Sequence, residues 1–187
     1  MTTGKTLAVL SAAAAACLAI ALVPQSKDHI PVGETAPAFE LQGADGKQYA
    51  LKDLTGKQPV FVLFWKERCP HNGRASALYN NLFAAYAGKV QFLGVVTSTV
   101  DGAKKWAESF GLKYPLLSDS TRSAISAFQL KKSICVIEIG TDGKIAAVYP
   151  GYGADSLNAL NQALAKAAGT SAVQVDLSSA PGGLTWG

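Results

Sequence analysis

Hydrophobic residues along this chain fall into short runs of two kinds. Residues 60–65 (VFVLFW) are apolar at every position and rich in β-branched and aromatic side chains, which predicts a central strand buried on both faces. Residues 38–41 and 48–51 instead alternate apolar with polar side chains. They flank the turn signal Asp45-Gly46, so they predict a β-hairpin that precedes the central strand.

After the central strand, helical and extended patterns alternate. Helices are predicted over residues 70–87, 101–110 and 120–128, the last capped by Ser120, and from a cap at Asp155 to Gly169. Further strands are predicted over residues 90–96, 114–117, 134–139 and 144–149. This order predicts a single α/β domain over residues 31–169, with a central mixed sheet, helices on both faces and an N-terminal hairpin extension. A reaction site is expected at the carboxyl end of the central strand, where Trp65 leads to Cys69.

The two ends of the chain differ from this domain. Residues 6–23 carry no charge, follow Lys5 and stop at Pro24, which is the layout of a secretory signal. The run is long for a signal core and short for a membrane span, so residues 1–30 are interpreted as a signal peptide or an uncleaved membrane anchor plus a linker. Either interpretation predicts export to the periplasm or cell envelope, with anchoring in the inner membrane if the segment is kept. Residues 170–187 have no periodicity and predict an extended or disordered tail.

Composition removes several classes of function. Of 187 residues 49% are hydrophobic and 16% charged, which excludes a disordered chain. The formal charge is +4, and the longest basic runs are the pairs Lys104-Lys105 and Lys131-Lys132, so nucleic-acid binding is not expected. With two histidines and three cysteines at no zinc-like spacing, neither a metal centre nor another cofactor is expected.

The segment around Cys69 is the candidate reactive site of the chain. Cys69 is predicted at the N-cap of the helix and Pro70 at its first position, where proline fits well. Free N–H groups and the positive end of the helix dipole would then favour the thiolate over the thiol. The alternative is a buried apolar cysteine in a strand–helix turn. Around this nucleophile the predicted rim consists of Trp65, Lys66, Arg68, Pro70, His71, Asn72, Arg74 and Ile134.

Several fragments, taken in order, resemble one family. They are Gly33-Glu34-Thr35-Ala36-Pro37, Asp45-Gly46-Lys47, Cys69-Pro70-His71, Tyr114-Pro115-Leu116-Leu117-Ser118-Asp119 and Asp142-Gly143-Lys144-Ile145. Their order and spacing resemble the redoxin (AhpC/TSA) branch of the thioredoxin-like superfamily. The resemblance implies a thioredoxin-like fold and thiol-based redox chemistry with Cys69 as the attacking sulfur.

The chain also departs from that family at the reactive turn. Exported thioredoxin-like members carry Cys-x-x-Cys, and the position of the second cysteine holds Asn72 here. Without that cysteine, Cys69 cannot close an internal disulfide within the turn. Peroxiredoxins carry Pro-x-x-x-Thr-x-x-Cys, and the corresponding positions hold Val62 and Lys66, so the peroxide pocket of that group is not visible.

Cys135 is the other cysteine of the predicted domain. It follows Ser133-Ile134, in the register where the family places a cis-proline, and the resemblance puts this loop opposite the reactive turn. Cys135 is therefore a candidate resolving cysteine for Cys69, with a small core residue of a strand as the alternative.

These observations lead to two hypotheses of different kinds. The first is an exported thiol-dependent oxidoreductase in which Cys69 attacks a peroxide, as in an antioxidant peroxiredoxin-like enzyme, or a protein disulfide. An external thiol or thioredoxin-type reductant, or Cys135, would complete that cycle. The alternative is a catalytically degenerate thioredoxin-fold module that binds or scaffolds a partner in the cell envelope.

Overall fold

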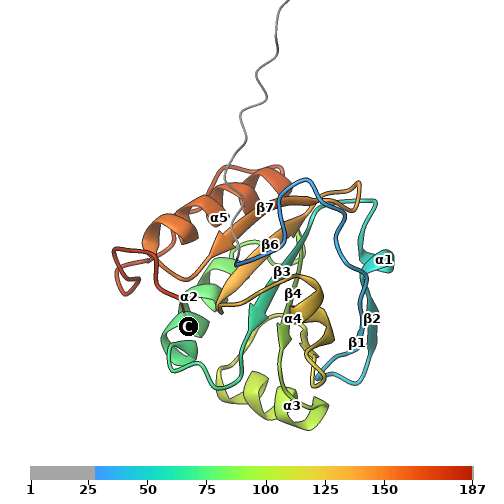
Figure 1. Cartoon of the computed structure of the whole chain (residues 1–187). Helices are drawn as coiled ribbons and strands as arrows, with labels where there is room; N and C mark the ends of the chain where they lie inside the picture. The colour runs from blue at the N-terminus through green and yellow to red at the C-terminus, as the bar shows by residue number, and fades with distance from the viewer. Residues whose placement is uncertain (1–27, 187) are drawn as a thin grey trace, which may run out of the picture.

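A five-stranded mixed sheet forms the centre of the molecule (Figure 1). The computed structural model describes residues 28–186. The strand order is β5-β4-β3-β6-β7, with β3 (Val60–Trp65), β4 (Gln91–Val96), β5 (Leu116–Ser118), β6 (Cys135–Ile139) and β7 (Ile145–Pro150). Strands β3, β4 and β5 are parallel, whereas β6 and β7 run antiparallel to their neighbours. This is the predicted thioredoxin-like α/β fold, with the apolar run β3 at its centre.

The predicted hairpin is also confirmed. Strands β1 (Glu40–Gln42) and β2 (Gln48–Ala50) pair antiparallel in a small separate sheet. Its loop turns at Gly46, which adopts the left-handed conformation that glycine accepts without steric cost. The second segment was expected to extend through Leu51, but that residue instead begins the one-turn helix α1 (Leu51–Leu54).

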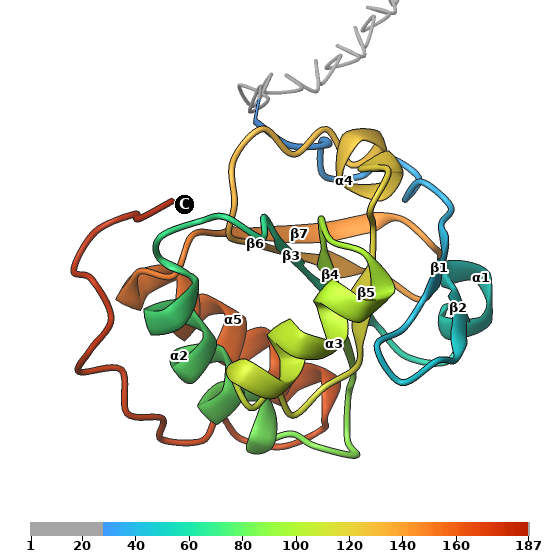
Figure 2. The same cartoon turned by 90° about the horizontal axis from the view of Figure 1, so that it is seen from below.

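Helices cover both faces of the central sheet (Figure 2). They are α2 (Asn72–Ala84), α3 (Val100–Ser109), α4 (Ser123–Ala127) and α5 (Ala154–Ala167). Helices α2, α3 and α5 pack on one face and the short helix α4 on the other. Side chains of β3 alternate between two core clusters. Phe61, Leu63 and Trp65 belong to the first core cluster, on the face covered by α2, α3 and α5. Their neighbours Val60, Val62 and Phe64 belong to the second core cluster, on the face covered by α4.

The two predicted helix caps outside the reactive turn are each wrong by two positions. Arg122, not Ser120, is the N-cap of α4, and the buried carboxylate of Asp119 accepts hydrogen bonds from the backbone N–H groups of the first turn. Asp119 does this because two carboxylate oxygens satisfy two orphan donors at once. At α5 the N-cap is Gly153, and Asp155 lies inside the first turn.

The C-terminal segment is extended, and it lies against the domain (Figure 2). Asn161 of α5 donates to the carbonyl of Val173, whose own N–H donates to the Tyr86 hydroxyl. Further on, the segment passes over Gly153, where a Cβ would come within 2.2 Å of the Gly183 carbonyl oxygen. The tail is therefore held by these hydrogen bonds, by apolar side chains such as Val173, Val175 and Leu177 that pack against the core, and by a close approach that only glycine permits.

The expected signal peptide or anchor lies almost entirely outside the described residues. Within residues 28–186, the helices are all too short or too polar to cross a membrane.

Candidate active site

Cys69 lies in a tight loop between β3 and α2. Its N–H donates to the Lys66 carbonyl at 3.0 Å, and its own carbonyl accepts from the Asn72 N–H at 3.2 Å. Helix α2 begins at Asn72 with His71 as the N-cap, so Cys69 is not the cap that was predicted and Pro70 is not the first helical residue. The difference arises because Pro70 and His71 form one more turn before the regular helix starts. Cys69 is half-buried and its thiol is free.

A cavity of about 570 Å³ opens beside the Cys69 turn. It is lined by Lys66, Glu67, Arg68, Cys69, Pro70, Thr97, Ser120 and Arg122. Of the predicted rim, Lys66, Arg68 and Pro70 lie here. The far wall consists of Thr97, after β4, and of Ser120 and Arg122, after β5.

That far wall was missed from the sequence although a signal for it existed. In parallel sheets the carboxyl ends of neighbouring strands meet at one edge, and ligand sites form there. Applying the rule to β4 and β5 as well as to β3 would have pointed to Thr97 and Ser120.

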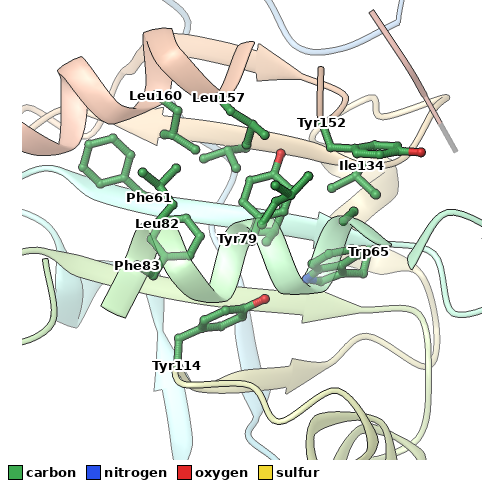
Figure 3. Packing of buried hydrophobic residues seen from close by; sticks show 14 of the residues in the cluster. Phe61, Trp65, Tyr79, Leu82, Phe83, Tyr114, Ile134, Tyr152, Leu157 and Leu160 are labelled. Carbon is green, nitrogen blue, oxygen red and sulfur yellow. The ribbon is translucent and has the colours of Figure 1, made fainter. Parts of the chain in front are cut away.

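The other predicted rim residues lie away from the cavity. Trp65 and Ile134 are completely buried and pack in the first core cluster (Figure 3). Both side chains are apolar or aromatic and lie in or next to buried strands, so they are buried in the core instead of lining the cavity. His71 has a ring nitrogen 2.9 Å from the Tyr152 hydroxyl, and Arg74 is exposed on α2.

Asn72 stabilises the reactive turn. Its side chain is buried, and its amide nitrogen donates to the carbonyls of Lys66 at 3.0 Å and Glu67 at 3.1 Å. These two bonds hold the loop after β3 against the start of α2. The Asn72 side chain therefore has a structural role in this turn.

The charges around the cavity are dominated by cations. The Lys66 amino group donates to the Lys131 carbonyl, and burial lowers the pKa of Lys66, with Arg122 lowering it further. The Cys69 sulfur, in contrast, raises the pKa of Lys66. Glu67, the acid among the lining residues, has its carboxylate bonded to the Ser98 hydroxyl at 2.7 Å.

Cys135 lies apart from this site. It is fully buried in β6, opposite Phe64, within the second core cluster, and it does not line the cavity. Its thiol is free, and burial raises the pKa of Cys135 because the charged thiolate would lose its hydration. The peptide bond between Ser133 and Ile134 is cis. These surroundings match the alternative interpretation, a small core residue, better than that of a resolving thiol.

Fold and site together define a class: thioredoxin-like proteins with a half-buried cysteine after the central strand. Within it, the chain belongs to the AhpC/TSA family, whose model matches residues 32–148. Thiol-disulfide oxidoreductase ResA of Geobacillus thermodenitrificans is 31% identical over 127 residues, covering 67% of this chain and 72% of the relative. ResA of Bacillus subtilis is 28% identical over 135 residues, covering 70% and 74%.

Solved structures show the same fold. The thioredoxin domain of a thiol-disulfide oxidoreductase from Bacteroides vulgatus matches with a TM-score of 0.62 at 21% identity, covering 72% of this chain and 99% of that chain. Peroxidoxin BcpB from Mycobacterium tuberculosis matches with a TM-score of 0.55 at 26% identity, covering 63% and 83%. The expected family and fold are confirmed, and the chain is a thiol-dependent oxidoreductase of the redoxin type.

Proposed function

We propose that this protein exchanges disulfides through one nucleophilic cysteine, Cys69, and takes its second thiol from outside the chain. One observation carries the proposal: Cys69 is the cysteine that lines the cavity, whereas Cys135 is sealed in the core. Three positions after Cys69, where a resolving thiol would stand, the buried amide of Asn72 holds the loop instead. The ResA relatives, named thiol-disulfide oxidoreductases, favour the same chemistry.

The cycle has two exchange steps. The Cys69 thiolate attacks one sulfur of a substrate disulfide, forms a mixed disulfide and releases the other sulfur as a thiolate. An external thiolate then attacks the substrate sulfur of this mixed disulfide. The sulfur–sulfur bond to Cys69 breaks, Cys69 leaves as the regenerated thiolate, and the substrate half is joined to the external thiol in a new disulfide. Lys66 and Arg122 line the same cavity as Cys69.

Peroxide reduction is the second candidate. The likeness to peroxidoxin BcpB and the absence of a neighbouring second cysteine favour it. Cys69 would then attack a peroxide oxygen to give a sulfenic acid and water, and an external thiol would reduce it. Against this candidate, Val62 is buried in β3 and Lys66 replaces the hydroxyl residue of the peroxiredoxin pattern.

The two chemistries separate in one experiment. Reduced protein is mixed with a small disulfide or with hydrogen peroxide, and the products on Cys69 are followed by intact mass spectrometry, with a sulfenic-acid trap in the peroxide arm. We expect rapid mixed-disulfide formation, and peroxide oxidation no faster than that of a free thiol, because no hydroxyl at residue 66 orients the peroxide. Fast oxidation with slow exchange would favour the peroxidase. An inert but accessible Cys69 would favour the scaffold module.

We also propose that the protein is exported, because residues 6–23 are free of charge and apolar in the layout of a secretory signal. Fused to a reporter that is active only outside the cytoplasm, residues 1–30 should give activity, and Leu18→Arg should abolish it by placing a charge in the apolar run. Membrane fractionation then separates an anchor from a cleaved signal. Activity that persists in the Leu18→Arg fusion would contradict export through this segment.

A further inference from the structure

The cavity beside Cys69 carries an excess of positive charge that comes from two separate loops. Lys66 and Arg68 follow β3, whereas Arg122 follows β5 and caps α4. Against these three cations the lining offers one acid, Glu67. Its carboxylate is engaged by the Ser98 hydroxyl at 2.7 Å. The cations thus face the cavity without a matching set of anions.

The cavity cations also form no ion pair in the part of the chain that the structure describes. Over residues 28–186 the ion pairs join Lys47 to Asp45 and Lys132 to Asp28, both outside the cavity lining. Surface cations without a partner are common, but two cations that come from separate loops and line one pocket together are not explained by solvation alone.

Lys66 is held close to Arg122 even though their charges repel. Its amino group donates to the Lys131 carbonyl, which fixes the side chain across the loop. Burial and the nearby Arg122 guanidinium both lower the pKa of Lys66. An anion bound between the two groups would remove this repulsion.

Neutral donors complete the lining. Thr97 Oγ1 accepts from the Glu67 N–H at 3.2 Å, which leaves the hydroxyl proton able to donate into the cavity. Ser120 supplies a second hydroxyl on the same wall. A guanidinium, an ammonium and two hydroxyls are the donors that recognise a carboxylate.

We infer that Lys66 and Arg122 form a carboxylate-binding subsite, and that the substrates of Cys69 are small disulfides bearing carboxylates. The inference rests on the proposed disulfide exchange and adds the class of substrate. The volume of about 570 Å³ supports a small ligand, because sites for small molecules span roughly 300–1,000 Å³. A disulfide of short peptides with free carboxylates has this size and charge.

Binding at this subsite sets up the exchange step. With its carboxylate on Lys66 and Arg122, the ligand presents its disulfide to Cys69, which lines the same cavity. The Cys69 thiolate forms a bond to the nearer sulfur while the old sulfur–sulfur bond breaks, and the departing half carries the electron pair away as a thiolate. The cations hold the anionic substrate and thereby raise its local concentration at the sulfur.

The test compares three small disulfides that differ in charge: dithiodiglycolate, which is anionic, bis(hydroxyethyl) disulfide, which is neutral, and cystamine, which is cationic. Rates of mixed-disulfide formation on Cys69 of the full chain are measured by stopped flow or quenched mass spectrometry. For Arg122→Gln we expect the anionic-to-neutral rate ratio to fall about fivefold, and the cationic-to-neutral ratio to rise. Comparing ratios cancels the intrinsic reactivity of each probe and any change in Cys69 itself.

Matched variants give the inference its controls. Arg122→Lys keeps the charge and should retain most of the preference for the anionic disulfide. Lys105→Gln removes an exposed cation of α3 outside the cavity and should leave the anionic-to-neutral rate ratio unchanged. Raising the salt concentration should lower the anionic-to-neutral ratio more in the wild type than in Arg122→Gln, which keeps Lys66 and Arg68. An unchanged ratio in Arg122→Gln would overturn the subsite while disulfide exchange stands. A folded wild type that reacts with none of the probes would overturn the proposed function itself.

Discussion

Replacing Cys69 by serine reduces disulfide exchange to the uncatalysed background, an expected loss of roughly a thousandfold or more. Serine keeps the shape of the side chain, but its hydroxyl stays protonated at neutral pH and cannot form a mixed disulfide. Cys69 is half-buried at the cavity and its backbone N–H and carbonyl carry the turn hydrogen bonds, which serine retains. The loss should therefore appear in the rate of exchange and not in the melting temperature. The measurement is turnover of a small disulfide with an excess of external thiol.

Cys135→Ala is the matched control for that variant. Because Cys135 is buried in β6 and burial raises its pKa, its thiol is neither reachable nor ionised at neutral pH. We expect activity within about twofold of the wild type and a stability loss of about 1 kcal/mol from the lost packing. A Cys135→Ala protein that folds, forms the mixed disulfide on Cys69 and then fails to turn over would show that Cys135 resolves it.

The sheet could be predicted from the sequence because its signals are local. Six consecutive apolar residues, rich in β-branched and aromatic side chains, predict the central strand, and the alternation in residues 38–41 and 48–51 predicts the hairpin. The closing strands β6 and β7 follow in the same way from two apolar runs joined by a glycine turn. In each case the period of the pattern and the position of a turn decide the structure.

The site could be predicted only in part, because its two walls come from different parts of the chain. Cys69 and the cations beside it lie in one segment, so the sequence pointed to Lys66 and Arg68. Arg122 is more than fifty residues away and reaches the cavity only because β5 lies next to β4 in a parallel sheet. The helix start was misplaced for a related reason: one extra turn before a helix costs little, and Asn72 stabilises it with bonds that no periodicity reveals.

The C-terminal tail shows the same limit. The attachment of residues 170–186 combines backbone hydrogen bonds with partly buried apolar side chains, among them Val173, Val175 and Leu177, that pack against the core. Glycines such as Gly153 allow the tail to approach closely, but in the sequence they cannot be distinguished from ordinary turn residues. An alternation of three apolar residues in an otherwise polar segment is too short a pattern to predict that such a tail docks.

Asn72→Cys should convert the single-cysteine cycle into an internally resolved one. The hydrogen bond from the Asn72 N–H to the Cys69 carbonyl, 3.2 Å long, closes a four-residue turn. The end Cα atoms of such a turn lie within about 7 Å of each other, and a disulfide needs roughly 4.4–6.8 Å. We expect the introduced thiol to attack the mixed disulfide on Cys69 and to shorten its lifetime by about a hundredfold or more, since the attack becomes intramolecular. Quenched mass spectrometry should show an internal disulfide in place of the adduct.

The matched control, Asn72→Ser, separates the effect of the new thiol from the effect of losing the amide. Asn72→Ser also removes the two amide bonds to the carbonyls of Lys66 and Glu67, so both variants should lose about 1–3 kcal/mol of unfolding free energy. Only the cysteine variant should shorten the lifetime of the mixed disulfide, because serine has no sulfur that could attack it. If the adduct on Cys69 lives equally long in both folded variants, the turn does not bring residue 72 within reach of the sulfur. A short lifetime in Asn72→Cys alone would instead mean that the wild-type asparagine is what makes the enzyme depend on an external thiol.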